Sequence, residues 1–213
     1  MSQEVSADAM SPRRERKKRQ TREALIHAAL GLFNAKGYEH TAVREITDAV
    51  DVSERTFFRY FASKEDLALS FAKDGTDALL AALKTRPAAE EPLTALREAF
   101  GESLRVVTEG DPDVPTYLLV TELIDSTPSL LAAYLRYMYD REEEVVRVLA
   151  EREGVDPAAD LRPRIVAAVF GSLIHLANRE WRTEGCGGAD SMLAAFDAFM
   201  DQLGPALAGH WNS

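Results

Sequence analysis

The sequence predicts an all-α protein with a small first domain and a larger second one. Apolar residues recur every three or four positions along almost the whole chain, as they do on the buried face of a helix. No segment shows the strict alternation of a β-strand, and Pro and Gly separate the periodic segments. About nine helices are expected, with no repeat of fixed length.

Four helices are expected in the first part of the chain. Each begins at a short polar residue that can accept a hydrogen bond from the first free backbone N–H groups. The expected starts are Ser11 (followed by Pro12), Thr41, Ser53 and Ser63. Gly37 is expected to end the first helix, and Tyr60 lies at the end of the third. The fourth, in which Ser63 and Asp66 resemble a capping box, is expected to run to about residue 85.

Five more helices are expected after the Pro- and Ala-rich connector "TRPAAEEP". They are predicted at residues 92–109, 114–126, 128–153, 157–184 and 189–204. The predicted domains are residues 1–20, a flexible basic arm with the start of the first helix, residues 21–67, and residues 68–213.

The net charge of −10 conceals an uneven distribution. Residues 1–73 hold 13 Lys+Arg and 11 Asp+Glu, whereas residues 74–213 hold 12 and 24. Six of the seven residues from Arg13 to Arg19 are basic. This pattern suggests one end that faces a polyanion on a body that repels phosphate, although the basic run alone could equally be a solvated tail.

Several other classes of protein are disfavoured. No apolar run approaches the ~18 residues of a membrane span, and the single Cys186 cannot form an intrachain disulfide, so a cytoplasmic protein without membrane contact is expected. The four His residues lack the spacing of metal ligands, and no Ser or Cys lies in a recognisable nucleophile turn. We therefore expect no enzyme activity, cofactor or metal.

Residues 41–61 have the pattern of a helix-turn-helix. Apolar residues at the right spacing can lock the two short helices together; these are Val43, Ile46, Val50, Val52, Phe57 and Phe61. Asp51 can adopt the left-handed backbone that the turn requires, though less readily than Gly. The side chains left exposed on the second helix are Arg55, Thr56, Arg59 and Tyr60, which suit contact with DNA.

The two segments "AALGLFNAKGYEHTAVREIT" and "VSERTFFRYFASKEDL" resemble the DNA-binding domain of the TetR family of bacterial transcription regulators. The resemblance implies a homodimer that binds a near-palindromic double-stranded operator and releases it when a small molecule enters the second domain. Matched position by position, it places these residues at DNA: Thr41, Arg44, Ser53, Arg55, Thr56, Arg59, Tyr60 and Lys64. At Lys64 we expect an exposed ammonium that meets a phosphate.

Two positions depart from the family pattern. Phe58 stands where the family commonly has Tyr, which removes a hydroxyl, and Asp51 stands where Gly is usual. Whether the Arg side chains contact bases or phosphates depends on their aim, which the sequence leaves open. The run from Arg13 to Arg19 is expected to contact phosphates or the minor groove.

The last two predicted helices are apolar around much of their circumference, and such helices need more than one partner. By the resemblance they form the dimer interface, with buried packing inside one subunit as the alternative. The expected interface residues are Ala167, Ala168, Gly171, Ser172, Leu193, Phe196, Phe199, Met200 and Leu203.

An effector pocket is expected among the central helices, although aromatic and Met residues at helical spacing are more often plain core. The expected lining residues are Phe100, Leu104, Tyr117, Leu131, Tyr134, Leu135, Met138, Phe170, Ile174, His175 and Asn178. Such a lining suits an apolar effector, and "FFRYF" slightly resembles regulators that sense acyl-coenzyme A. A helical protein-interaction module, or a small-molecule-binding protein without DNA binding, is the alternative function.

Overall fold

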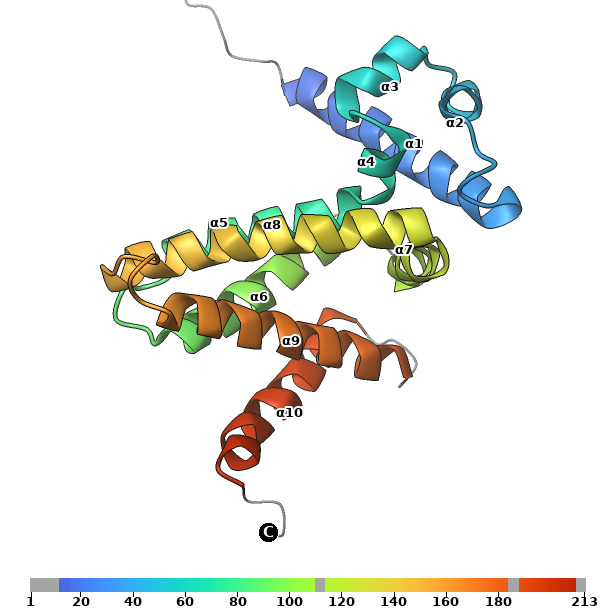
Figure 1. Cartoon of the computed structure of the whole chain (residues 1–213). Coiled ribbons are helices and arrows are strands. Elements are labelled where there is room, and N and C mark those ends of the chain that lie inside the picture. The colour runs from blue at the N-terminus through green and yellow to red at the C-terminus, as the bar shows by residue number, and fades with distance from the viewer. Residues whose placement is uncertain (1–11, 110–113, 184–187, 210–213) are drawn as a thin grey trace, which may run out of the picture. The chain divides into compact units, whose positions relative to one another are not determined.

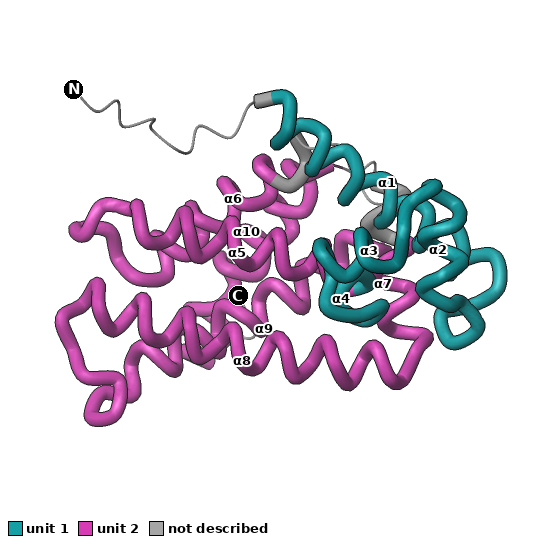
Figure 2. The backbone as a smooth tube through the Cα atoms, turned by 90° about the horizontal axis from the view of Figure 1, so that it is seen from above, with its two compact units in different colours: residues 1–68 teal, residues 69–213 magenta. Residues whose placement is uncertain are grey.

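The computed structural model describes residues 12–109, 114–183 and 188–209, which contain ten helices and no strand. The prediction of an all-α fold is confirmed (Figure 1). The chain forms two compact units, residues 1–68 and residues 69–213, coloured separately in Figure 2. Each unit is described by itself below.

Unit 1 holds four helices, α1 (Pro12–Lys36), α2 (Val43–Ala49), α3 (Glu54–Tyr60) and α4 (Lys64–Ala68). Its core is built from one face of α1 and the inner faces of the three short helices. The buried apolar residues are Leu25, Ala29, Leu30, Phe33, Tyr38, Ile46, Phe57, Phe61, Leu67 and Ala68. These side chains hold the short helices in place, because helices of five to seven residues are not stable alone.

Two of the expected helix starts, Ser53 and Ser63, are confirmed, Thr41 is wrong, and Ser11 lies outside the described residues. The first described helix begins at Pro12, Ser53 Oγ accepts from the backbone N–H of Thr56 (3.2 Å), and Ser63 Oγ accepts from that of Asp66 (3.0 Å). Thr41 does not cap α2, because Ala42 occupies the cap position. The Thr41 side chain instead turns inward.

The expected fourth helix is in fact two helices. It breaks at Leu69, whose φ of −91° and ψ of 0° leave the helical region, and α5 begins at Ser70. The sequence around Leu69 contains neither Pro nor Gly. No local signal therefore marks this break, which accounts for ten helices where nine were expected.

Unit 2 holds the other six helices, which are α5 (Ser70–Thr85), α6 (Pro92–Glu109), α7 (Val114–Ser126), α8 (Pro128–Glu153), α9 (Arg162–Thr183) and α10 (Ala189–Leu207). The predicted bounds of α6, α7 and α8 are confirmed. The predicted start of α9 at residue 157 is wrong, since the carboxylate of Asp160 accepts from the backbone N–H of Arg162 (2.9 Å) and opens the helix there. The predicted end of α10 at residue 204 is also wrong, because the helix continues through Pro205.

The core of unit 2 joins α6, α9 and α10 through three rings. The centroid of Phe100 lies 6.1 Å from that of Phe170 and 5.2 Å from that of Phe196, and the latter two are 5.6 Å apart. At the edge of this cluster the guanidinium of Arg97 donates two hydrogen bonds to the carboxylate of Asp197 (2.8 and 2.5 Å). Helix α10 is thus fastened to α6 by both packing and charge.

Two kinds of feature are absent from the described residues. No described helix is long and apolar enough to cross a membrane. No group of His, Cys, Asp and Glu in the same part of the chain is arranged to hold a metal ion.

Candidate nucleic-acid interface

Helices α2 and α3 form the expected helix-turn-helix, and the turn between them has the predicted geometry. Asp51 has a φ of 54°, in the left-handed region, and the backbone N–H of Val52 donates to the carbonyl of Thr47 (3.1 Å). Ile46 from α2 and Phe57 from α3 are fully buried. The apolar lock between the two helices is therefore confirmed, with the remaining Val residues of the set at its edge.

The outward face of α3 carries two cations. Arg55 and Arg59 are exposed, and the Arg59 guanidinium lies over the ring of Tyr60, 5.1 Å from its centroid. Arg55 has no hydrogen-bond or ion-pair partner within the described part of the chain. Side chains placed like this can reach phosphate oxygens or base edges without first breaking a hydrogen bond or ion pair to another described residue.

Three other expected contact residues lie beside this face. Thr56 and Tyr60 are half-buried, and the hydroxyls of Ser53 and Thr56 lie 3.0 Å apart. Ser53 also caps α3, so its hydroxyl already has a structural role. A further expected contact residue, Arg44, lies on α2. Its guanidinium is 3.8 Å from the carboxylate of Asp48, which is a weak surface ion pair.

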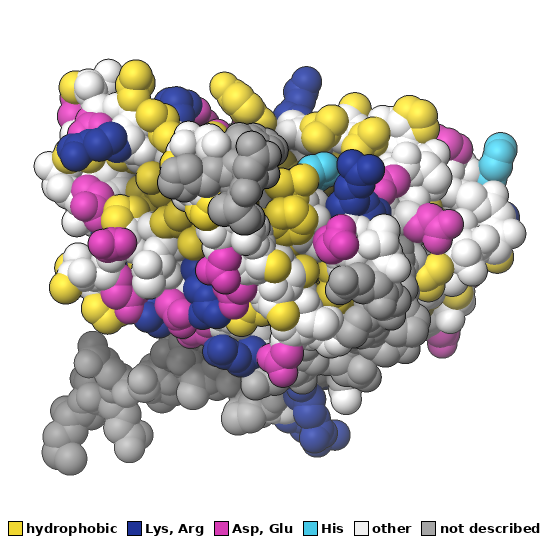
Figure 3. Space-filling model, turned by 90° about the horizontal axis from the view of Figure 1, so that it is seen from below, with side chains coloured by type: hydrophobic (Ala, Val, Ile, Leu, Met, Phe, Trp, Pro, Cys, Tyr) yellow, Lys and Arg dark blue, Asp and Glu magenta, His cyan; other side chains and the backbone are white. Residues whose placement is uncertain are grey.

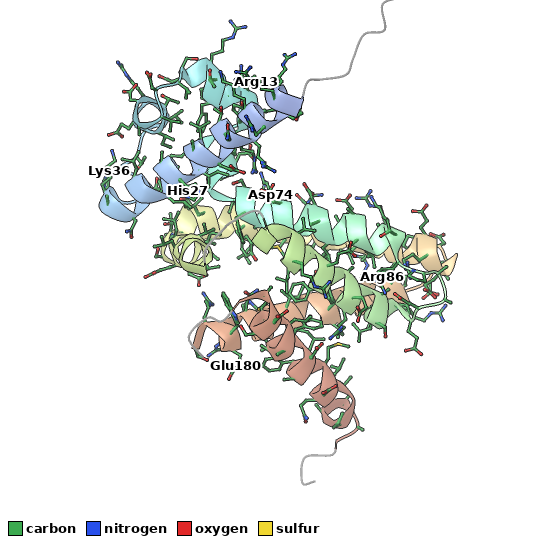
Figure 4. The ribbon with its side chains drawn as sticks, turned by 180° about the vertical axis from the view of Figure 1, so that it is seen from behind. Arg13, His27, Lys36, Asp74, Arg86 and Glu180 are labelled. Atoms are coloured by element: carbon green, nitrogen blue, oxygen red, sulfur yellow. The ribbon has the colours of Figure 1, made fainter. Side chains whose placement is uncertain are left out.

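The basic run belongs to the first helix, as the expected start at Ser11-Pro12 implied, and the expectation of a flexible arm is wrong for residues 13–20. Arg13 to Arg19 form the first turns of α1 and are all exposed. In Figure 4, Arg13 and Lys36 mark the two ends of this long helix. The run is therefore a straight rod with its charges at fixed positions.

The first turns of α1 lie against the end of α3. Between them is an open groove of about 420 Å³. It is lined by Arg14, Glu15, Lys17, Lys18 and Thr21 of α1 and by Arg59 and Tyr60 of α3. Basic side chains from two helices thus converge on one surface, a juxtaposition that the sequence alone did not predict. The expected helix start at Ser11-Pro12 indicated that these residues are helical, whereas their place beside α3 depends on tertiary packing.

The expectation of an exposed ammonium at Lys64 is wrong. Lys64 Nζ donates to the carbonyl oxygens of Tyr38 (2.7 Å) and Thr41 (2.9 Å), and it lies 4.2 Å from the ring centroid of Tyr38. Lys64 therefore ties α4 to the segment between α1 and α2. Two of its three donors are used inside the protein.

Thr41 likewise points inward and not toward solvent. Its side chain is 2% exposed, and its hydroxyl donates to the carbonyl of Gly37 (2.9 Å). Burial therefore removes this hydroxyl from the surface that a phosphate could approach.

Charges around α2 brace the same segment. Glu45 accepts from the backbone N–H of Ala42 (2.9 Å) and pairs with Lys36 of α1, and the pairing with Lys36 is the main cause that holds the pKa of Glu45 below its usual range. Burial, together with Glu65 and Glu39, raises the pKa of Tyr38 to about 12. The Tyr38 phenol beneath Lys64 therefore stays neutral at ordinary pH.

The expected effector-pocket residues do not all surround one space. Phe100 and Phe170 are packed in the aromatic cluster of the core, and Leu104 and Ile174 pack against it. Leu135 is 59% exposed and His175 is also exposed, so the expectation that they line an enclosed pocket is wrong for this single chain.

The other expected pocket residues are half-buried or undescribed. The half-buried ones are Leu131, Tyr134, Met138 and Asn178, and the side chain of Tyr117 lies outside the described residues. Burial is the main cause of a raised pKa at Tyr134, with Asp125 and Tyr137 acting in the same direction. Asp125 accepts a hydrogen bond from Arg182 (2.6 Å), so a polar group from α9 meets α7 near this tyrosine.

The expected interface residues of the last two helices divide into core and surface. Ala167 and Phe196 are buried within the chain, so they cannot meet a partner directly. Those that are exposed are Ala168, Gly171 and Ser172, and those half-buried are Leu193, Phe199, Met200 and Leu203.

Sequence reasoning missed large exposed apolar residues on α9 and at Leu161, the residue just before this helix. Leu161, Ile165 and Leu176 are 65%, 59% and 41% exposed. Together with Ala168 and Ser172 they form a stripe at spacings of three and four residues, which we call the α9 stripe. On the face of the molecule drawn in Figure 3, hydrophobic side chains reach the surface among charged ones.

Two family models match the chain. Residues 25–71 match the model described as bacterial regulatory proteins, tetR family, and residues 90–208 match the model described as MftR C-terminal domain. The two matches cover most of unit 1 and of unit 2, respectively.

Two curated relatives are similar over almost their whole length. The HTH-type transcriptional regulator TcmR of Streptomyces glaucescens is 43% identical over 202 residues, which is 93% of this chain and 89% of that protein. The mycofactocin biosynthesis transcriptional regulator MftR of Mycobacterium tuberculosis is 27% identical over 197 residues, covering 88% and 95%.

Solved structures share the fold at low sequence identity. NalD, the secondary repressor of the MexAB-OprM multidrug efflux pump in Pseudomonas aeruginosa, superposes with a TM-score of 0.55 at 18% identity, covering 88% of this chain and 96% of that one. A transcriptional regulator from Aquifex aeolicus VF5 gives a TM-score of 0.55 at 16% identity, covering 86% and 99%.

Proposed function

The chain belongs to the TetR family of bacterial regulatory proteins, and we propose that it represses transcription by binding a near-palindromic operator as a homodimer. Members of this family are regulators of transcription and not enzymes. The observation that carries the proposal is the basic surface of unit 1, in which Arg55 and Arg59 are exposed on α3 and Arg59 lines a groove with the basic first turns of α1. In this proposal α3 enters the major groove, and α1 contacts phosphates of the flanking backbone.

The charge distribution supports the proposal. Residues 74–213 hold 24 acidic and only 12 basic residues, so the second unit repels DNA. Unit 1, in contrast, presents exposed cations of α1 and α3 to phosphate. The protein would then act in the cytoplasm, where the bacterial chromosome lies.

Arg59→Ala tests the proposed interface. Its guanidinium is exposed and makes no ion pair among the described residues, so the thermal stability should change little. Affinity for operator fragments selected from the host genome should fall roughly tenfold or more in a gel-shift titration. Lys84→Ala, at an exposed Lys near the end of α5 in unit 2, is the matched control and should bind like the wild type. Unchanged affinity in Arg59→Ala would remove this residue from the interface.

The same titration separates regulators from the alternative functions. Binding of an operator must weaken steeply as salt rises, because protein cations displace counterions from DNA. A protein-interaction module or a small-molecule carrier has no such requirement. The absence of any bound genomic fragment at low ionic strength would contradict the proposal as a whole.

Homodimerisation through α9 and α10 is supported by the α9 stripe, because its large apolar side chains remain exposed in the single chain. A pair of identical subunits would present two α3 helices to half-sites about one helical turn, ~34 Å, apart or a multiple of that. Operator sequences should therefore show twofold symmetry.

We also propose that a small apolar molecule binds unit 2 and releases the operator. Half-buried Leu131, Tyr134 and Met138 on α8 support an apolar site, and the nearby Asp125–Arg182 pair offers polar groups for one end of a ligand. A long-chain acyl-coenzyme A is the first effector to test. Fluorescence anisotropy of a labelled operator should fall as this compound is added; no release at about tens of micromolar would exclude this effector class.

A further inference from the structure

Phe58 lies on the surface of α3 although both neighbouring phenylalanines of that helix segment are interior. Its side chain is 54% exposed, whereas Phe57 and Phe61 are 0% and 3% exposed. The exposed part of this ring contributes nothing to the core of unit 1. Its position beside the exposed Arg55 on α3 therefore calls for a partner that covers it.

The ring lies next to Arg55 on the outward side of α3. Phe58 follows Arg55 by three positions, so the two side chains are neighbours on the helix surface, while Arg59 lies on the other side of Arg55. The edge of its ring packs against Phe57, with centroids 5.3 Å apart and an interplanar angle of 83°. A buried side chain thus orients Phe58, while the rest of the ring faces outward.

The chemistry of a phenyl ring limits what it can recognise on DNA. It has no hydrogen-bond donor or acceptor, so it cannot bond to a phosphate or to the polar edge of a base. The apolar group that the major groove offers is the 5-methyl of thymine. The adjacent guanidiniums would bring the ring to the groove by their attraction to the flanking phosphates.

We propose that Phe58 is a specificity-determining residue that packs against the 5-methyl group of a thymine in each half-site of the operator. The inference rests on the proposed function. It adds the methyl group of the operator that is contacted and the side chain that contacts this group. It predicts that the operator contains a symmetry-related pair of thymines facing α3. It also predicts that these thymines contribute to affinity through their methyl groups.

The test removes one methyl group at a time from the DNA. An operator is selected with the full-length protein, and symmetry-related thymines are then replaced pairwise by deoxyuridine, which pairs identically but lacks the 5-methyl group. Removal of one buried methyl is expected to weaken binding about fourfold per half-site, or about fifteenfold for a pair, at one position. Wild-type affinity should be unaffected by replacement at thymines outside the interface.

Protein variants then assign the methyl contact to Phe58. Phe58→Ala and Phe58→Gln should bind the thymine operator more weakly and lose the response to deoxyuridine at that position. Phe58→Tyr, which keeps the ring, should retain the response. Arg59→Ala is the matched control: its overall affinity should fall while the response to deoxyuridine persists. Thermal melts check that each variant is folded.

The outcomes distinguish this inference from the proposed function. If the wild type binds its operator but responds to deoxyuridine at no position, the inference is overturned and DNA binding stands. The same holds if folded Phe58→Ala responds as strongly as the wild type, since another residue then contacts the methyl group. If the wild type binds no DNA, the proposed function itself fails. If a protein partner covers Phe58 instead, DNA affinity will be unchanged in Phe58→Ala, which also overturns the inference.

Discussion

Asp51 illustrates what a single residue contributes to the helix-turn-helix. Its φ of 54° is the only positive φ of a residue other than Gly among the described residues. A left-handed backbone costs an L-residue roughly 1–2 kcal/mol, and less for Asp, while Gly adopts it freely. The turn is therefore held under mild strain by the apolar lock on either side of it.

We predict that Asp51→Gly raises the free energy of unfolding by up to about 1 kcal/mol, because it relieves this strain. Chemical denaturation followed by circular dichroism measures the change. Asp48→Gly is the matched control: the same substitution at an exposed position within α2 should lower stability, since Gly weakens a helix interior. Reduced stability in both variants would show that Asp51 is not strained.

Lys64 shows how burial can change the role of a charged residue. Because its ammonium donates to the Tyr38 and Thr41 carbonyls, Lys64→Gln should destabilise the fold by about 1–3 kcal/mol. The salt dependence of operator binding should be unchanged, because this ammonium neutralises no phosphate. Denaturation and binding at several salt concentrations measure the two effects. A stable variant whose salt slope falls by about one unit would instead indicate that Lys64 binds a phosphate.

At the scale of a helix, α1 is the element that places the cations of the basic run for contact with DNA. Its 25 residues include the whole run from Arg13 to Arg19, so the cations are spaced by helix geometry. Residues 14, 17, 18 and 21 all line the groove beside α3, since positions three and four apart share one side of a helix. A rigid rod can contact phosphates at a smaller cost in conformational entropy than a flexible tail.

The double variant Lys17→Gln, Lys18→Gln should therefore weaken binding to operator and to unrelated DNA by the same factor. The slope of log affinity against log salt should become shallower by about 0.9 for each phosphate that the variant no longer neutralises. The double variant Lys84→Gln, Arg136→Gln changes two exposed cations of unit 2 and should leave the slope unaltered. If only operator affinity fell, α1 would be contacting bases and not the backbone.

At the scale of the whole molecule, the apolar surface of unit 2 supports the proposed pairing with a second copy of the chain. Ile165 lies in the α9 stripe and is 59% exposed, with Arg164 before it paired to Glu143 of α8. A twofold interface repeats each contact, so a charge placed at residue 165 is introduced twice.

We predict that Ile165→Asp weakens the monomer–dimer equilibrium by at least about a hundredfold. Sedimentation at micromolar concentration should then show monomers, and operator affinity should fall with dimer content. Val106→Asp, at a residue of α6 that is 56% exposed, is the matched control and should remain dimeric. Wild-type protein that sediments as a monomer would contradict the dimer itself.

The sequence by itself determined the all-α class, the helix-turn-helix and the cap of its second helix, because these depend on periodicity and on residues a few positions apart. Ser53 as the cap of α3 and Asp51 in the left-handed turn are such local effects, and the structure confirms both. The family resemblance rests on the same short segments, and the similarity to known regulators confirms it.

Only the tertiary structure decided which side chains are buried and which stay exposed. Lys64 bends back to Tyr38, 26 positions away, Phe196 is enclosed by rings from α6 and α9, and the basic turns of α1 meet α3. Such contacts join residues that are distant along the chain, so no local pattern encodes them. The same packing leaves Phe58 and the α9 stripe exposed. These particular side chains could therefore be proposed for contact with DNA and with a second subunit only once the fold was known.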